Sequence, residues 1–214
     1  MNMNILFGFF RLQDSLCARI IPYFEKIKFR YICTRNNVTI GKKWVITNKC
    51  PIFYTNKKGE IAIGNNFTFN SYRNTSWYCN CYFAAVGTGK IEIGDNVGVN
   101  GIMIHSKKHI KIGNNVRIGG GTRIYDTNFH SLNYLDRRNG IKDAENASMS
   151  PVIIEDDVFI GTSVIIGKGV TIGARSTIAA GSVVVKSIPA DCIAGGNPCK
   201  VIKMLKNEGK KEEV

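Results

Sequence analysis

The sequence predicts a mainly β protein whose chain winds as a parallel β-helix of six-residue repeats. Isoleucines open five successive hexads, at Ile154, Ile160, Ile166, Ile172 and Ile178. A related phrase, Ile-Gly followed by two more corner residues, occurs upstream at Ile40, Ile63, Ile93, Ile112 and Ile118. An amphipathic helix spaces apolar residues by three and four, and a single strand spaces them by two, so a strict period of six fits neither.

Each hexad is long enough for a short strand and a corner, with one large side chain pointing inward. Coils stacked in this way pair their strands in parallel and share one continuous core, which a single coil cannot form. The glycines and asparagines of the repeat suit corners, where positive φ costs them little. An ordinary sandwich of turn-rich strands is the alternative, and five successive hexads argue against it.

Composition limits the classes of partner. The 214 residues carry a formal net charge of +13, and from Lys26 to Gly59 there are nine Lys or Arg residues and no Asp or Glu. This charge favours an acidic partner or forms a solvated face. We expect no nucleic-acid partner, because a nucleic-acid module would explain the charge but not the repeats. The seven cysteines show no disulfide framework, which predicts reduced thiols and a cytoplasmic protein. No apolar run approaches the ~20 residues of a membrane span.

The organisation along the chain follows from where the hexads lie. Residues 1–37 precede them, and apolar residues share one helical face over residues 3–31, with Pro22 dividing the segment. This segment is expected to cap the β-helix or to contact a membrane peripherally. The β-helix is expected over 38–188, with insertions at 70–90 and 125–151. Residues 189–214 are expected to form a turn, a short C-terminal helix and a basic tail.

Three stretches together resemble a known family. They are Asp126-Thr-Asn-Phe-His130-Ser131, Pro151-Val-Ile-Ile-Glu-Asp-Asp-Val-Phe-Ile-Gly161, and Ile178-Ala-Ala-Gly-Ser-Val-Val-Val-Lys186 followed by Gly195-Gly-Asn-Pro-Cys-Lys. The pattern resembles the hexapeptide-repeat acyltransferases, and over residues 91–204 their sugar O-acetyltransferases of the maltose, galactoside and capsular polysaccharide types. The resemblance implies a left-handed β-helix with three hexads per coil, a homotrimer, and acetyl-CoA as co-substrate.

The resemblance also implies a histidine base on the polar insertion, and His130 is the candidate. Acetyl transfer to an alcohol requires removal of the hydroxyl proton, which a neutral imidazole does well near neutral pH. Asp126 is the nearest candidate in sequence to orient the imidazole, and a backbone carbonyl is the alternative. His105 and His109 could complete a zinc site only if all three histidines converged, so no metal is expected.

The family likeness further implies residues for the two substrates. Asn100 and Asn128 are candidates to bind the sugar, although Asn100 also suits a plain corner. The coenzyme A candidates lie near the small residues of the last coils and the basic C-terminal segment: Phe159, Gly161, Thr162, Ala179, Ala180, Gly181, Lys186, Lys200 and Lys203. The family usually has Trp where Phe159 stands and Ala where Cys199 stands, so a hydrogen bond from an indole N–H is not expected here.

These observations favour an acetyl-CoA-dependent O-acetyltransferase that acts on a sugar or surface-polysaccharide acceptor, in the cytoplasm or at the inner face of the membrane. N-acetylation of a nucleotide-linked amino sugar is a second hypothesis. Those enzymes often carry an N-terminal nucleotide-binding fold, for which the 37 residues before the first hexad leave no room. A non-catalytic β-helix scaffold is a hypothesis of another class, and it does not require a histidine on a polar insertion.

Overall fold

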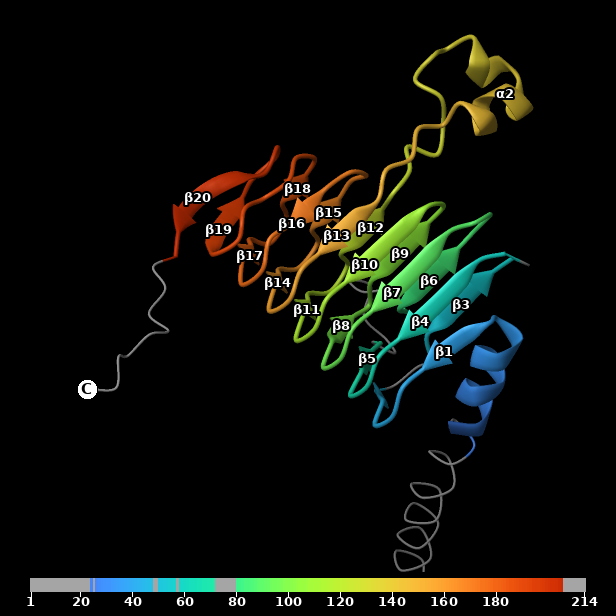
Figure 1. Ribbon diagram of the computed structural model, residues 1–214, viewed down its shortest axis with the longest axis vertical. Coiled ribbons are helices and arrows are strands. Elements are labelled where there is room, and N and C mark those ends of the chain that lie inside the picture. The colour runs from blue at the N-terminus through green and yellow to red at the C-terminus, as the bar shows by residue number, and fades with distance from the viewer. Residues whose placement is uncertain (1–23, 25, 48–49, 57, 72–79, 206–214) are drawn as a thin grey trace, which may run out of the picture.

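The computed structural model describes residues 24, 26–47, 50–56, 58–71 and 80–205. Three parallel sheets form the faces of a prism, and up to β18 the neighbours in each sheet are three strands apart in chain order. One turn of the chain therefore adds one strand to every sheet. Figure 1 shows these coils stacked from the blue N-terminal end to the red C-terminal end.

The strands of the three sheets have the following bounds. The first sheet contains β1 (Val38–Ile40), β4 (Glu60–Ile63), β7 (Lys90–Ile93), β10 (His109–Ile112), β13 (Val152–Ile154) and β16 (Thr171–Ile172). The second contains β2 (Val45–Thr47), β5 (Thr68–Asn70), β8 (Gly98–Asn100), β11 (Arg117–Ile118), β14 (Phe159–Ile160), β17 (Thr177–Ile178), β19 (Cys192–Gly195) and β20 (Lys200–Met204). The third contains β3 (Ile52–Thr55), β6 (Tyr82–Ala85), β9 (Met103–Ser106), β12 (Arg123–Tyr125), β15 (Ile165–Ile166) and β18 (Val183–Val184).

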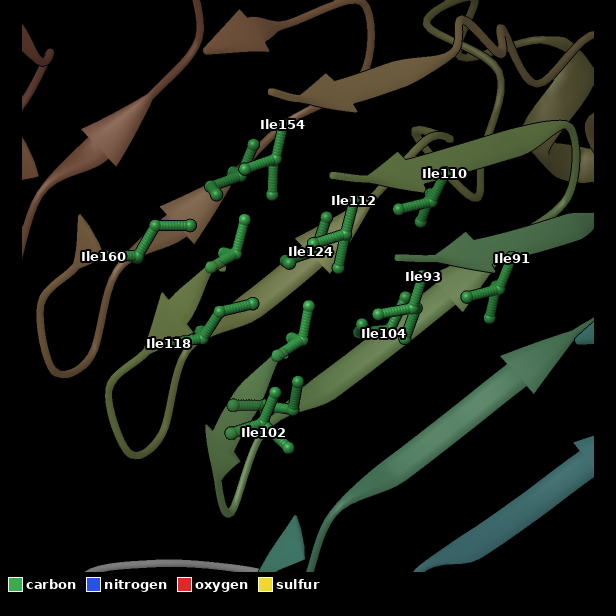
Figure 2. Packing of buried hydrophobic residues seen from close by; sticks show 14 of the residues in the cluster. Ile91, Ile93, Ile102, Ile104, Ile110, Ile112, Ile118, Ile124, Ile154 and Ile160 are labelled. Atoms are coloured by element: carbon green, nitrogen blue, oxygen red, sulfur yellow. The ribbon is translucent and has the colours of Figure 1, made fainter. Parts of the chain in front are cut away.

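The inward residues of successive coils stack in register as ladders, which confirms the predicted stacking of the coils around one core. Along the first sheet the paired residues are Ile40, Ile63, Ile93, Ile112, Ile154 and Ile172. Along the third they are Phe53, Phe83, Ile104, Ile124, Ile166 and Val184. Figure 2 shows the central isoleucines converging between the sheets. Each coil buries its apolar side chain against the coils above and below, so the core is continuous.

The corners explain the second half of the repeat phrase. Asn66, Asn96 and Asn115 all have positive φ, between 54° and 59°. The Asn96 side chain accepts from Asn66 Nδ2 at 2.8 Å and donates to Asn115 Oδ1 at 3.1 Å. Asparagine is therefore used at this corner both for its tolerance of the left-handed region and for a ladder of amides. A Cβ on Gly94 would lie 2.5–2.9 Å from Asn114 Oδ1 and the Gly113 backbone, so only glycine lets the coils stack this closely.

A helix over 26–35 covers the first coils. Its Phe29 and Cys33 are buried, and the Phe29 ring lies 4.5 Å from the Trp44 ring and 5.6 Å from the Phe69 ring, centroid to centroid. Aromatic side chains thus fill this end of the core, where isoleucines fill the middle. The remainder of the expected helix, including Pro22, lies outside the described residues.

Two sequence expectations are corrected by the structure. The insertion expected at 70–90 is shorter, because Tyr82–Ala85 form the regular strand β6 and place Phe83 in the third ladder. Aromatic residues there hid the hexad pattern, and residues 72–79 lie outside the described part. Over the described residues 189–205 the expected short C-terminal helix is also wrong: β19 continues the second sheet in parallel beside β17, and β20 (Lys200–Met204) pairs antiparallel with β19.

Candidate active site

The polar segment between β12 and β13 forms a loop that projects from the prism. Its base is a short antiparallel pairing: the Ser150 N–H donates to the Asp126 carbonyl at 2.9 Å, and the Asn128 N–H donates to the Ser148 carbonyl at 3.1 Å. Beyond this base the loop carries the short helices η1 (Asp136–Arg138) and α2 (Gly140–Glu145). In Figure 1 it is the yellow segment that stands clear of the coils.

His130 forms a pair with Asp143 on this loop. Its Nδ1 lies 2.7 Å from Asp143 Oδ2, and the Ser131 N–H donates to Asp143 Oδ1 at 2.8 Å. These two hydrogen bonds hold the pKa of Asp143 below its usual range, and the hydrogen bond from His130 has the larger effect. An ionised carboxylate only accepts hydrogen bonds, so Nδ1 is the donor in this pair, and in the neutral imidazole the lone pair is then on Nε2. The His130 side chain is 69% exposed, so Nε2 is accessible to a substrate.

Helix α2 positions the Asp143 side chain beside the imidazole of His130. The Asn139 side chain caps the helix by accepting from the N–H groups of Ile141 and Lys142 at 3.0 and 3.2 Å. Such a cap fixes where a short helix begins. Asp143 is one turn further on, where its side chain reaches back to the segment that carries His130.

Asp126 does not orient His130, and that expectation is wrong. It is fully buried, and its carboxylate accepts from Ser106 Oγ at 2.6 Å and from the N–H groups of Lys107 and Lys108 at 2.8 Å each. It therefore fastens the end of β12 to the corner after β9. Proximity in sequence was misleading because the chain leaves the prism after Asp126, and this side chain stays behind in the coil.

Phe129 holds the backbone beside His130. It has a φ of 65°, an unusual conformation for a bulky residue. Its ring packs edge-on against His105 at 4.9 Å and Tyr125 at 5.3 Å, centroid to centroid. These contacts from β9 and β12 compensate for the backbone conformation, which directs the next residue out of the coil. Neither Phe129 nor Asp143 had a sequence signal that would have marked it.

The other two histidines lie elsewhere. His109 Nε2 is 2.6 Å from Glu92 Oε2 on the first sheet. The His105 ring is the one that packs edge-on with Phe129, and its Nε2 is buried without a hydrogen-bond partner in the described structure. Burial lowers the pKa of His105, and the positive charge of Lys107 lowers it by a smaller amount. Among the described residues no group of three or more His, Cys, Asp or Glu side chains is arranged to hold a metal ion.

The two predicted sugar-binding asparagines are separated. Asn128 lies on the same loop as His130, where its Nδ2 donates to Ser148 Oγ at 3.1 Å, so part of its hydrogen-bonding capacity is used in the loop base. Asn100 ends β8 beside Asn70, at the corner between the second and third sheets. The loop of His130 instead leaves the corner between the third and first sheets.

Most of the predicted coenzyme A residues share one edge with Asn100. Gly161 and Thr162 follow β14, and Ala179, Ala180 and Gly181 follow β17, all at the corner between the second and third sheets. The Gly181 N–H donates to the Thr162 carbonyl at 2.8 Å, so the two coils are directly stacked. A Cβ on Gly161 would lie 2.6 Å from Ala180 N, which makes glycine a packing requirement here.

Of the remaining candidates, three lie on the second sheet and one lies at another corner. Phe159 is 52% exposed on β14, and Lys200 and Lys203 are exposed on β20 of the same sheet. Lys186 follows β18 at the corner between the third and first sheets, on the side of the His130 loop. A single chain therefore presents the imidazole at one corner of its prism and the small-residue edge at another, and it does not bring them together.

A prism of three parallel sheets with three strands per coil is the architecture of the left-handed parallel β-helix proteins, and this one carries an exposed histidine–carboxylate pair at one corner. Residues 151–186 match the family model described as the hexapeptide repeat of succinyl-transferase. A hexapeptide-repeat containing acetyltransferase of Vibrio cholerae, VCA0836, is 30% identical, with 90% of each chain covered and a TM-score of 0.58. The chain belongs to the hexapeptide-repeat acetyltransferase family.

Three further relatives are also named as acetyltransferases. The maltose O-acetyltransferase of Clostridium difficile 630 is 28% identical, with 90% of this chain and 86% of that chain covered and a TM-score of 0.50. WbbJ of Escherichia coli strain K12, provisionally assigned as a lipopolysaccharide biosynthesis O-acetyl transferase, is 31% identical over 73% of this chain and 78% of that protein. The chain spans about half (56%) of a further relative, YJL218W of Saccharomyces cerevisiae, which is 37% identical over 116 residues.

Proposed function

We propose that the protein transfers an acetyl group from acetyl-CoA to a hydroxyl group of a sugar or surface polysaccharide. The observation that carries the proposal is the pairing of His130 Nδ1 with Asp143 Oδ2 at 2.7 Å, which leaves the exposed Nε2 as a base. A VCA0836 structure in complex with acetyl coenzyme A and the maltose O-acetyltransferase support the co-substrate and the class of acceptor.

The proposed reaction is a direct transfer. The thioester of acetyl-CoA supplies the activated acyl carbon. His130 Nε2 takes the proton of the acceptor hydroxyl as the oxygen attacks that carbon, and Asp143 stabilises the resulting imidazolium. When the tetrahedral intermediate collapses, the carbon–sulfur bond breaks and His130 returns the proton to the leaving sulfur. The products are the acetyl ester and free CoA thiol.

A homotrimer would complete the site. The edge with Asn100, Gly161 and Ala180 and the loop with His130 lie at different corners of the prism, so a neighbouring copy must bring one to the other. Exposed apolar side chains on the third sheet favour such a contact: Ile52, Tyr54, Met103 and Ile165 are 37–53% exposed. In this arrangement Phe159, Thr162, Ala179 and Gly181 would line the pantetheine groove. Lys186, Lys200 and Lys203 would pair with phosphates.

Incubation with acetyl-CoA and a panel of sugars, with release of free thiol as the readout, tests the proposal. We expect thiol release that depends on a hydroxylated sugar and a product ester of one acetyl group, seen by mass spectrometry. An amide product on an amino sugar would favour the N-acetylation hypothesis instead. Absence of turnover on every sugar, with no binding of coenzyme A, would favour a non-catalytic scaffold.

Replacement of Asp143 with Asn is expected to lower kcat about 10-fold or more and to leave KM for acetyl-CoA unchanged. The amide can donate to Nδ1, which would move the ring proton to Nε2 and remove the base. Steady-state kinetics measure the separation of kcat from KM. Glu145→Gln, an exposed neighbour on the same helix, is the matched control and should keep full activity. Equal kcat values for the two variants would exclude Asp143 as the positioning residue.

A further inference from the structure

The outward face of the helix formed by Phe24 and residues 26–35 is apolar, and its large side chains are exposed. Phe24, Ile27 and Tyr31 are 61%, 49% and 63% exposed. Their spacing of three and four residues puts them on one face, while Phe29 and Cys33 face the core. The helix therefore has two apolar faces, and only one of them is used to cap the coils.

A basic groove adjoins this helix. Lys26, Arg30, Lys42 and Lys43 contribute to the lining of a groove of about 860 Å³ between the helix and the corner from β1 to β2. Within the described part of the chain none of these four side chains forms an ion pair with an acidic residue. The sequence has no Asp or Glu between Lys26 and Gly59.

We propose that this cap surface, formed by Phe24, Ile27, Tyr31, Lys26, Arg30, Lys42 and Lys43, binds the anionic headgroups of a phospholipid bilayer. Exposed aromatic and aliphatic side chains on a helix with surrounding Lys and Arg are the features of an interfacial membrane helix. Lys and Arg near an anionic leaflet each contribute to binding, and their aliphatic stems can lie along the apolar boundary. A soluble anion would use the cations and leave the apolar face exposed.

The position of this surface permits membrane contact during catalysis. It lies at the β1 end of the prism, while the loop of His130 leaves between β12 and β13, further along the stack (Figure 1). None of the described helices combines the length and apolar character needed to cross a bilayer. The proposal of lipid binding depends only on this surface. The idea that lipid binding brings the enzyme to a membrane-borne acceptor rests on the proposed function.

Co-sedimentation of the full chain with vesicles tests the proposal. We expect binding to vesicles of equimolar phosphatidylcholine and phosphatidylglycerol, weakened by salt, and little binding to phosphatidylcholine alone. Lys42→Gln with Lys43→Asn should weaken binding about 30-fold, because each Lys or Arg contributes about a factor of five. Asn is chosen at Lys43 because the backbone there has a φ of 58°. Lys111→Gln with Lys168→Gln removes the same charge from the sides of the prism and should bind like the original chain.

A second variant separates the apolar contribution from charge. Ile27→Ser with Tyr31→Ser should also weaken vesicle binding, with an unchanged oligomeric mass by light scattering. A changed mass would assign the face to a second copy of the chain and overturn the proposal. Equal binding to neutral vesicles, equal binding by the two lysine variants, or binding of inorganic polyphosphate without binding of vesicles would overturn it too. Acetyl transfer to a soluble sugar without vesicles should be the same in all variants, so the proposed function is tested separately.

Discussion

Replacement of His130 with alanine is expected to lower kcat about 10²-fold or more, because a positioned general base contributes about that factor to the transfer. The imidazole is 69% exposed and contacts Asp143 at the rim of the loop, so its loss leaves no cavity in the core. Coenzyme A binding and subunit assembly should therefore persist. Thiol release under saturating acetyl-CoA and sugar measures the effect.

His109 offers a matched control within the same chain. It too pairs with a carboxylate, with Nε2 2.6 Å from Glu92 Oε2, but it lies on β10 of the first sheet and is not part of the loop. His109→Ala should retain the original kcat. Full activity of His130→Ala, or an equal loss in both variants, would show that the loop imidazole is not the base.

Replacement of Asp126 with alanine is expected to reduce the free energy of unfolding by at least about 3 kcal/mol. The carboxylate is fully buried and accepts three hydrogen bonds, two of them from the backbone N–H groups of Lys107 and Lys108. Alanine would leave those donors without an acceptor, and unsatisfied buried groups cost more than the net value of their hydrogen bonds. Denaturation in urea at one fixed protein concentration measures the change.

Comparison with two other variants separates stability from catalysis. Asp126→Asn keeps one carbonyl acceptor and should lose less stability than Asp126→Ala. Asp143→Asn should lose activity with little change in the urea midpoint, because Asp143 lies on the projecting loop. If Asp126→Ala unfolded at the same urea concentration as the original chain, the buried carboxylate would have no structural role.

The period-six pattern was sufficient to predict the β-helix because every coil repeats the same local requirements. An inward aliphatic residue and a corner tolerant of positive φ recur in each hexad, so stacking of the opening isoleucines could be expected from the sequence. The structure then pairs Ile93, Ile112 and Ile154 along the first sheet. The pattern failed where the repeat changes chemistry. Phe83 replaces the aliphatic residue in β6, and the antiparallel β20 lies outside the repeat.

The sequence by itself determined the repeat, the ladder and the polar loop that carries His130, because these depend on residues close together in the chain. Only the tertiary structure decided which carboxylate meets the imidazole. The loop leaves the prism after Asp126, keeps that side chain in the coil, and returns Asp143 through helix α2 to 2.7 Å from His130. Spacing in the sequence carries no information about such a return, since it depends on helix capping and on the packing of Phe129 against His105 and Tyr125.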